Sequence, residues 1–285
     1  MKTGLLTATM KPEEVESRAK EAFELALMSL DKEMSEMESV ESGHDQSGST
    51  SVMTLLSKTH IVCANTGDSR AVMSRAGACI ELSFDHKPYN PKEKERIEKA
   101  GGQVKFNRVN GDLAVSRALG DFVYKRCATA DAKEQAVTAF PEVITETRSS
   151  ADEFIVLACD GIWDVMSSQE VVDKVRQMLL EGRPELPPLD DAADDEPSAS
   201  AASGGVSERP PPPPPRQWDL GAVCECLIDH CLRLGSRDNM SVIVVLLNPA
   251  FAPKPEQGSA GGGAVGTAST ASAASSSGAA ASSAP

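Results

Sequence analysis

The sequence predicts a protein of the α+β class, with strands in the middle of the chain and helices at both ends and between the strands. Two observations predict this class. Apolar residues recur at helical spacing near the N-terminus and again after residue 220, whereas the middle contains short apolar runs bounded by turn residues. With 40% hydrophobic and 25% charged residues, the bulk of the 285-residue chain reads as globular, and the 4% of aromatic residues predicts an aliphatic core.

The first expected element is a long amphipathic helix from Pro12 to about Met37. Pro12 suits its first turn, and the apolar residues that follow recur every three or four positions, as on one face of a helix. The residues of this face are Val15, Ala19, Ala22, Phe23, Ala26, Leu30, Met34 and Met37. After a polar break, Ser51–Leu56 and His60–Ala64 are expected to form two strands around a turn at Ser57-Lys58.

Turn residues mark the next elements. A short helix is expected to begin at Asn90-Pro91, with Glu93 at the capping position, and to end at Gly101-Gly102. The Asn110-Gly111 pair is typical of a tight hairpin turn.

The second half of the chain predicts a buried strand followed by a helix. The apolar run Phe154–Cys159 is the expected strand. Ser167 and Glu170 form a capping box for a helix over Val171–Leu180.

The last two expected elements are a helix and a strand. Apolar residues at helical spacing run from Leu220 to Leu234, and Gly235 stops the helix. The final strand is Ser241–Leu247.

Two stretches differ in composition from the rest and are expected to be disordered. Residues 181–217 combine acidic side chains, an Ala/Ser/Gly patch and six prolines at 210–215, and residues 249–285 form an Ala/Ser/Gly-rich tail. Because periodic segments lie on both sides of the first stretch, we interpret it as an insertion within one domain over residues 1–248. The proline run is either a semi-rigid spacer or a docking site for a partner module. About 210 residues remain, enough for one domain with its own core.

Charge and composition exclude several classes of protein. The chain has 28 Lys and Arg against 42 Asp and Glu, a net charge of −14, which argues against binding to nucleic acid or to anionic membranes. No signal peptide precedes Lys11 and no run of about 18 apolar residues appears, so we expect an intracellular protein of the cytoplasm or nucleus.

The seven cysteines contain no Cys-x-x-Cys pair and the four histidines are scattered, which argues against a zinc site. Cys63 and Cys159 lie in apolar runs and are expected to be buried.

Four aspartates stand out because they lie at the ends of predicted strands. Asp68 follows the strand at His60–Ala64, and Asp238 precedes the last strand. Asp160 comes directly after the apolar run Phe154–Cys159, and Asp164 follows four residues later. Where strand ends converge, carboxylates repel one another unless a cation neutralises them, and hard oxygen ligands suit Mg²⁺ or Mn²⁺. Such ions, especially as a pair, activate a bound water and stabilise charge on a phosphoryl group.

Each of these signals also has an ordinary structural interpretation. Asp and Gly are common turn residues. The segment Ser47-Gly48-Ser49-Thr50 is either a phosphate cradle or a turn with close sheet packing, and Arg117 is either a phosphate ligand or part of an internal ion pair. Periodicity alone does not name a reaction.

Several strings occur in one specific order along the chain. They are Ser47-Gly48-Ser49-Thr50, ANTGDSRAV (64–72), Asp85-His86-Lys87-Pro88 with Glu95-Arg96-Ile97 and Gly101-Gly102, VNGDLAVSRALGDF (109–122), Pro141-Glu142-Val143, FIVLACDGIWDV (154–165) and SRDNMSVIVV (236–245). In this order they resemble the metal-dependent (type 2C) protein serine/threonine phosphatase family, over most of residues 20–248 apart from the insertion. The resemblance implies a four-layer α-β-β-α sandwich of two antiparallel sheets. It also implies hydrolysis of phosphoserine and phosphothreonine in phosphoprotein substrates by a metal-activated water.

The resemblance also implies roles for individual residues. Asp160 and Asp238 match ligands of a binuclear Mg²⁺ or Mn²⁺ centre, and Asp68 and Asp164, with Asp160, match acids linked to a more weakly held third ion. Segment 107–140 corresponds to the flap that influences substrate choice in the family. No catalytic residue is assigned in this chain, and the phosphate-binding residue is unknown.

The chain departs from the family pattern upstream of these strings. The family has an Arg that binds phosphate, a Glu metal ligand and an Asp-Gly-His-Gly-Gly string with the bridging aspartate, and none of these is present. Gly43-His44-Asp45 looks similar, but the long helix that separates the two strings in the family here precedes His44, which we interpret as a loop residue. We therefore expect an N-terminally truncated domain with weakened metal binding and exposed sheet edges. One alternative is a catalytically impaired phosphatase-like binding module, and another is a hydrolase of a different phosphate ester.

Overall fold

The computed structural model describes residues 12–181 and 220–248. The expected insertion at 181–217, apart from its first residue, and the expected tail at 249–285 lie outside the described residues. No helix in the described part of the chain is long and apolar enough to cross a membrane.

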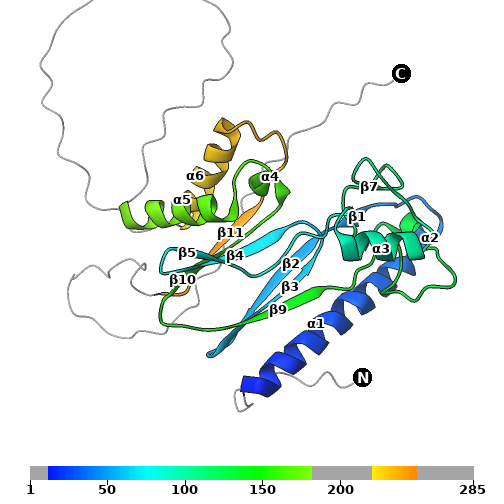
Figure 1. Cartoon of the computed structure of the whole chain (residues 1–285), viewed down its shortest axis with the longest axis horizontal. Helices are drawn as coiled ribbons and strands as arrows, with labels where there is room; N and C mark the ends of the chain where they lie inside the picture. Colours follow the sequence, from blue (N-terminus) through cyan, green and yellow to red (C-terminus); the bar gives the residue numbers. More distant parts are fainter. Residues whose placement is uncertain (1–11, 182–219, 249–285) are drawn as a thin grey trace, which may run out of the picture.

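Two antiparallel sheets form the centre of the protein (Figure 1). The first has the strand order β2-β3-β9, from Ser51–Leu56, His60–Thr66 and Glu142–Thr147. The second has the order β11-β10-β4-β5, from Val242–Leu246, Asp152–Ala158, Arg70–Arg75 and Ala78–Glu81. Two small pairings lie beside them: β1 (Gly48–Ser49) with β8 (Leu119–Gly120), and β6 (Val104–Lys105) with β7 (Arg108–Val109).

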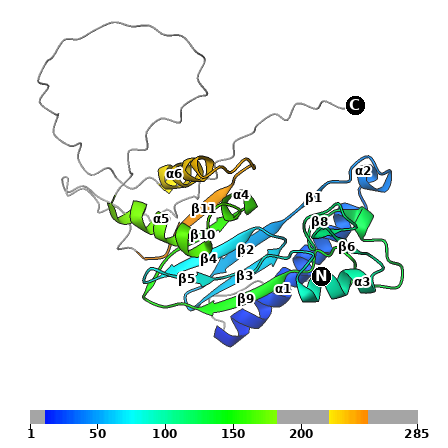
Figure 2. The same ribbon diagram turned by 45° about the horizontal axis from the view of Figure 1, so that its top comes forward.

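Helices cover the outer faces of both sheets (Figure 2). The long helix α1 (Pro12–Ser35) contacts β3 and β9, and the pair α5 (Ser168–Glu181) and α6 (Leu220–Arg233) packs on the second sheet. The shorter helices are α2 (Glu38–Glu41), α3 (Pro91–Lys99), α4 (Asp160–Trp163) and the 3₁₀ turn η1 (Phe122–Tyr124). This arrangement confirms the predicted α+β sandwich of helices, two sheets and helices.

Strand β10 joins the two hydrophobic layers, because every one of its residues is buried. Successive side chains of a strand point to opposite faces. Phe154 and Val156 accordingly pack toward the helices, whereas Ile155 and Leu157 pack between the two sheets. A strand that is buried on both faces has apolar residues at consecutive positions of the sequence, and this pattern predicted the strand.

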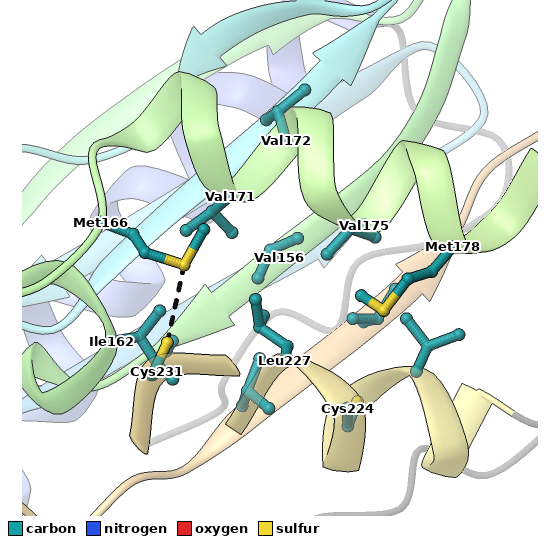
Figure 3. Packing of buried hydrophobic residues seen from close by; sticks show 14 of the residues in the cluster. Val156, Ile162, Met166, Val171, Val172, Val175, Met178, Cys224, Leu227 and Cys231 are labelled. Carbon is teal, nitrogen blue, oxygen red and sulfur yellow. Dashed lines mark hydrogen bonds between the residues drawn. The ribbon is translucent and has the colours of Figure 1, made fainter. Parts of the chain in front are cut away.

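The layer between the second sheet and its helices is filled by aliphatic and sulfur-containing side chains (Figure 3). Val171 and Val175 of α5 and Leu227 of α6 pack around Val156, and the Cys231 thiol lies 3.6 Å from the Met166 sulfur. Such polarizable sulfur groups fill irregular gaps well, so this chain makes a dense layer with few aromatic rings.

The start of α5 and the turn at Asn110-Gly111 have the structure that the sequence predicted. Ser167 and Glu170 form the capping box: the Ser167 N–H and hydroxyl donate to Glu170 Oε2 at 2.8 and 2.7 Å. Asn110 and Gly111 both have positive φ, 54° and 86°, which is the conformation that a tight Asn-Gly turn requires.

The buried face of α1 differs from the predicted one. Ala19, Leu27 and Asp31 are buried, whereas Ala22 and Ala26 are exposed. The buried residues are spaced four or eight positions apart and form a narrow stripe that faces the first sheet. The other apolar residues of the predicted face therefore do not lie on this stripe. A buried aspartate on this stripe is not visible in a pattern of apolar residues.

Asp31 joins α1 to the 107–140 segment. Its Oδ1 accepts hydrogen bonds from the Gly120 N–H at 2.9 Å and from Lys125 Nζ at 2.7 Å. We predict that Asp31→Asn lowers the free energy of unfolding by about 1.5–3 kcal/mol, the usual range for a hydrogen bond to a charged group. Urea unfolding measures this, with the exposed Glu33→Gln of the same helix as the control. Equal midpoints for the two variants would contradict the anchoring role.

Candidate active site

The ends of three neighbouring strands lie side by side at one end of the second sheet, which we call the acidic edge. In the register of this sheet, Ala158 at the end of β10 lies opposite Val242 of β11 on one side and Arg70 of β4 on the other. Asp160 follows Ala158 and begins α4, Asp238 precedes Val242, and Asp68 precedes Arg70. The structure therefore places these three aspartates at the same sheet edge, as their positions after and before strands predicted.

The aspartates interact electrostatically. Burial raises the pKa of Asp160, and the negative charges of Asp68, Asp238 and Asp164 raise it further. Asp68 is buried and Asp160 is half-buried, whereas Asp164 and Asp238 are exposed. A cation at this edge would relieve the repulsion.

The four aspartates provide the type of ligand that a hard divalent cation prefers, but too few of them lie together to complete its coordination shell. Carboxylate oxygens are what Mg²⁺ and Mn²⁺ prefer. However, the described residues contain no group of three or more His, Cys, Asp or Glu side chains placed to hold one metal ion. The ligands present here would need further donors, such as water or substrate oxygens, to complete a coordination shell.

Glycine at position 161 allows the two candidate ligand segments to approach each other. A Cβ on Gly161 would lie 2.7 Å from the Asn239 carbonyl oxygen, so the 236–240 loop packs directly on the backbone of α4. The Ser236 hydroxyl donates to the Gly161 carbonyl at 2.7 Å and fixes the same contact. The Asp238 carboxylate turns back and accepts the Asn239 N–H at 2.7 Å.

Lys87 lies at this edge and was not singled out by the sequence analysis. Its Nζ lies 2.5 Å from Asp68 Oδ2. Burial acts to lower the pKa of Lys87, but the hydrogen bond to Asp68 and the nearby carboxylates outweigh it and raise that pKa. Lys87 therefore stays charged and offsets part of the negative charge at the edge. The only signal for it in the sequence is the string Asp85-His86-Lys87-Pro88.

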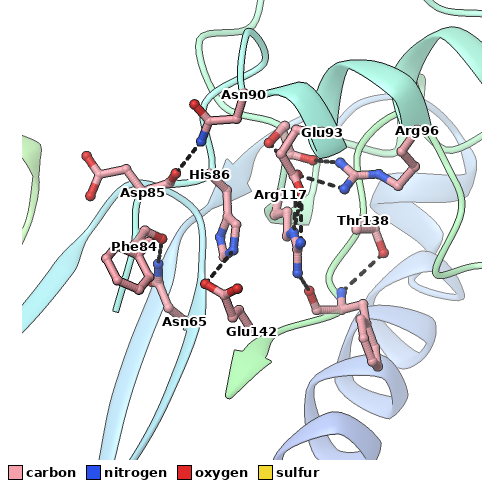
Figure 4. A network of polar contacts seen from close by, with 12 residues as sticks. Asn65, Phe84, Asp85, His86, Asn90, Glu93, Arg96, Arg117, Thr138 and Glu142 are labelled. Carbon is pink, nitrogen blue, oxygen red and sulfur yellow. Dashed lines mark hydrogen bonds and ion pairs between the residues drawn. The ribbon is translucent and has the colours of Figure 1, made fainter. Parts of the chain in front are cut away.

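Two buried polar residues clamp the turn that carries Asp68 (Figure 4). His86 Nδ1 accepts the Gly67 N–H at 3.2 Å, and the Asn65 amide donates to the carbonyls of Gly67 and Phe84 at 3.0 Å each. Burial and the positive charge of Arg117 lower the pKa of His86 to about 3, so the ring is neutral with its proton on Nε2. Both residues hold the backbone next to Asp68, a role that sequence reasoning missed because the contacts of Asn65 with Phe84 and of His86 with Gly67 join residues 19 positions apart.

The buried ion-pair network at Glu93 resolves two predictions (Figure 4). Arg117 is the internal ion-pair partner rather than a phosphate ligand, because its guanidinium lies 2.7 Å from Glu93 and also donates to the Phe140 carbonyl. The predicted capping role of Glu93 is wrong. Its carboxylate is 2.7 Å from Arg96 and accepts the Ser116 hydroxyl at 2.6 Å, which draws it into the interior and away from the helix start.

The small residues before β2 pack closely. A Cβ on Gly48 would lie 1.9 Å from the Asp121 carboxylate, which supports the close sheet packing interpretation of Ser47–Thr50. His44 is exposed, and its Nδ1 lies 2.9 Å from the Ser42 hydroxyl, as expected for a loop residue.

Of the two cysteines expected to be buried, only Cys63 is. It is 1% exposed. Cys159 is partly exposed because β10 ends just before it, and its sulfur accepts the Ser241 N–H at 3.2 Å.

Two facing antiparallel sheets with outer helices, and aspartates gathered at one sheet edge, define a class of sandwich proteins with an acidic centre at the strand ends. The family described as Protein phosphatase 2C matches residues 6–240 of this chain. The chain therefore belongs to the protein phosphatase 2C family.

Individual relatives agree with this membership. The chain is 55% identical over 168 residues to a probable protein phosphatase 2C of Caenorhabditis elegans, a match that covers 59% of this chain and 47% of that protein. It is 42% identical over 235 residues to protein phosphatase 1B of Rattus norvegicus, covering 82% of this chain and 51% of the relative. The chain thus spans about half the length of these curated relatives.

The fold is similar to that of a solved family member. The crystal structure of serine-threonine phosphatase 2C from Toxoplasma gondii matches with a TM-score of 0.59 at 24% identity, covering 86% of this chain and 73% of that one. At this identity the similarity supports the fold alone.

Proposed function

We propose that this protein hydrolyses phosphoserine and phosphothreonine in intracellular phosphoproteins, with Mg²⁺ or Mn²⁺ as cofactor. Asp160 and Asp238 would be ligands of a binuclear centre, and Asp68 and Asp164, with Asp160, would support a third, more weakly held ion. When bound, such ions activate water and offset the negative charge of the phosphoryl group. The observation that carries the proposal is the convergence of Asp160, Asp238 and Asp68 at one sheet edge in a chain of this family.

The chain's own residues would prepare this edge in three ways. Asn65 and His86 fix the turn before Asp68, and Lys87 pairs with the Asp68 carboxylate. The contact of Gly161 with the 236–240 loop holds Asp238 near Asp160. The Glu93 network holds Ser116 and Arg117 of the 107–140 segment against α3, near His86.

The test is Mn²⁺-dependent hydrolysis of a phosphothreonine peptide by the whole 285-residue chain. We expect turnover that EDTA abolishes and that Asp160→Asn lowers by about 100-fold or more, because the half-buried carboxylate would be the central ligand. The matched control is Glu225→Gln, an exposed acid on α6, which should keep full turnover. Circular dichroism and Mn²⁺ binding by calorimetry accompany each assay.

The outcomes separate the two functions that the sequence suggests. Turnover that survives EDTA, or equal turnover in Asp160→Asn and the control, would contradict the metal site. Folded protein without turnover would favour the alternative, a phosphatase-like binding module. That alternative is supported by one observation, which is that the described residues form no group of three or more candidate ligands.

A further inference from the structure

An open cavity beside the acidic edge is lined by two exposed aromatic rings. It has a volume of about 300 Å³, and Phe84 and Tyr89 contribute its apolar surface. These side chains are 55% and 53% exposed, although aromatic rings contribute strongly to binding when they are covered. Figure 4 shows Phe84 and Asp85 on the side of the loop that faces away from the Glu93 network. The same loop therefore exposes Phe84 and Tyr89 to solvent, whereas its buried His86 binds the Gly67 N–H.

The cavity adjoins the candidate active site through Lys87. This lysine lines the cavity, and its Nζ binds Asp68 at the acidic edge. The charges of both Asp68 and Lys87 act on Asp160. A peptide whose phosphorylated residue reaches this edge would thus carry a neighbouring side chain across the cavity.

The cations in the cavity wall are already paired. Arg70 donates to both oxygens of Asp85, at 2.8 and 2.9 Å, and to the Ser168 hydroxyl at 2.9 Å. Its guanidinium also lies over the Trp163 ring, 5.1 Å from the centroid. With Lys87 held by Asp68, neither cation is available to bind a negative group.

The charge that remains is negative. Glu81, the last residue of β5, is exposed and lines the cavity. Its charge acts on the nearby Arg70, but within the described ranges 12–181 and 220–248 it forms no ion pair, because Arg70 is bound to Asp85. A carboxylate beside two aromatic faces is the combination that attracts a cationic side chain, through charge and through cation–π contact. A planar guanidinium uses both surfaces at once, whereas an ammonium acts as a point charge.

We propose that the cavity formed by Glu81, Phe84 and Tyr89 is a substrate subsite for a basic side chain, preferentially arginine, near the phosphorylated residue. The subsite rests on the proposed phosphatase function for its place in catalysis, but not for its binding chemistry. It would make the substrate choice of this protein depend on the loop before α3 as well as on the 107–140 segment.

The experiment compares phosphothreonine peptides that carry one arginine, moved through the three positions on either side of the phosphothreonine, with the same peptides carrying citrulline. Citrulline keeps the shape of arginine and removes its charge. Fluorescence anisotropy measures peptide binding in EDTA, and kcat/KM is measured with Mn²⁺. At the position that reaches the cavity, we expect arginine to bind about 3- to 10-fold tighter than citrulline, from the size of exposed cation–π and ion-pair contacts.

Two variants test the assignment of the preference to this cavity. Glu81→Gln and Phe84→Leu should each lower the arginine-to-citrulline ratio by about twofold or more, since the first removes the negative charge and the second removes one of the two aromatic faces. Glu98→Gln, an exposed acid on α3 outside the cavity lining, should leave the ratio unchanged. Hydrolysis of p-nitrophenyl phosphate, which has no flanking side chain, should be the same in all four proteins.

The results separate failure of the subsite from failure of the proposed function. No arginine preference in the wild type, or an equal preference in wild type, Glu81→Gln and Phe84→Leu, would overturn the subsite. A preference for citrulline or for an acidic residue would also overturn it. If p-nitrophenyl phosphate is not hydrolysed but the binding preference depends on Glu81, the subsite stands and the phosphatase proposal falls.

Discussion

Replacing Glu93 by glutamine should lower the free energy of unfolding by about 3–5 kcal/mol, the usual cost of removing one partner from a buried ion pair. The Glu93 carboxylate accepts from Arg96, Arg117 and the Ser116 hydroxyl, at 2.7, 2.7 and 2.6 Å. Its side chain is 4% exposed, and those of the two arginines are 9% and 16% exposed. Without the carboxylate, two guanidinium groups would remain largely buried with carbonyl partners only.

Chemical denaturation of wild type and variant measures this effect. Glu95→Gln is the matched control, because Glu95 lies on the same helix but is exposed and pairs with Lys99 at the surface. The control should unfold at the wild-type midpoint. Similar midpoints for Glu93→Gln and Glu95→Gln would show that the guanidinium groups find water in the variant, and that the network does not stabilise the fold.

The same carboxylate gives the fold a specific dependence on acid. Burial acts to raise the pKa of Glu93, but the hydrogen bond and charge of Arg117 outweigh it, and the pKa falls to about 2 from an ordinary 4.5. A carboxyl whose pKa is lower in the folded state stabilises that state above its unfolded pKa, and this stability is lost as the pH falls toward the folded pKa. The stability difference between wild type and Glu93→Gln should therefore be full above about pH 4.5 and shrink toward pH 2.

The network also explains how a helix and a distant segment are joined. Arg96 donates to the carbonyls of Ser116 and Gln135, and Arg117 donates to the Phe140 carbonyl. The bonds from Arg96 hold Ser116 and Gln135, both within the 107–140 segment, against α3. Loss of Glu93 should thus loosen this segment, beside the loop that carries His86 and Lys87, as well as destabilise the fold.

Local patterns predicted much of the fold. The buried strand at 154–159, the capping box at Ser167 and the Asn110-Gly111 turn each depend on residues within a few positions of one another, so the sequence displays them. Strands β4, β5 and β9 were not predicted individually. Their edges are defined by pairing with distant strands, which composition and periodicity do not encode.

The candidate site was predictable in part for the same reason. Asp160 and Asp238 flank long apolar runs, and their position marks them as strand-end acids. Lys87 and His86 were missed because their contacts with the Asp68 turn form only when the loop before α3 lies against that turn. Asn65 was missed because its second partner, the Phe84 carbonyl, is on the same distant loop. Glu93 was misassigned because its spacing from Asn90 is that of a capping residue, whereas tertiary ion pairs determine where its side chain lies.

The larger functional effect should come from Gly161, a residue with no side chain to react. An added Cβ would lie 2.7 Å from the Asn239 carbonyl oxygen and 2.8 Å from Met240 Cγ, so Gly161→Ala must push the 236–240 loop away from α4. Asp238 would then move relative to Asp160. A displacement of about 1 Å at reacting groups can cost about 100-fold in rate, so we expect the proposed Mn²⁺-dependent turnover to fall by about that factor.

Stability should fall by a smaller amount in Gly161→Ala, about 1–3 kcal/mol, as is usual for overpacking. The control is Gly101→Ala, where φ is +84° and a Cβ would meet no atom within 4 Å, so this change strains the backbone without moving the 236–240 loop. It should lose some stability and keep its turnover. Thermal unfolding and Mn²⁺ affinity, measured on both variants, distinguish a displaced ligand from a merely weaker fold. If Gly161→Ala keeps wild-type turnover and Mn²⁺ affinity, Asp238 does not depend on this contact, and its assignment as a metal ligand beside Asp160 would have to be abandoned.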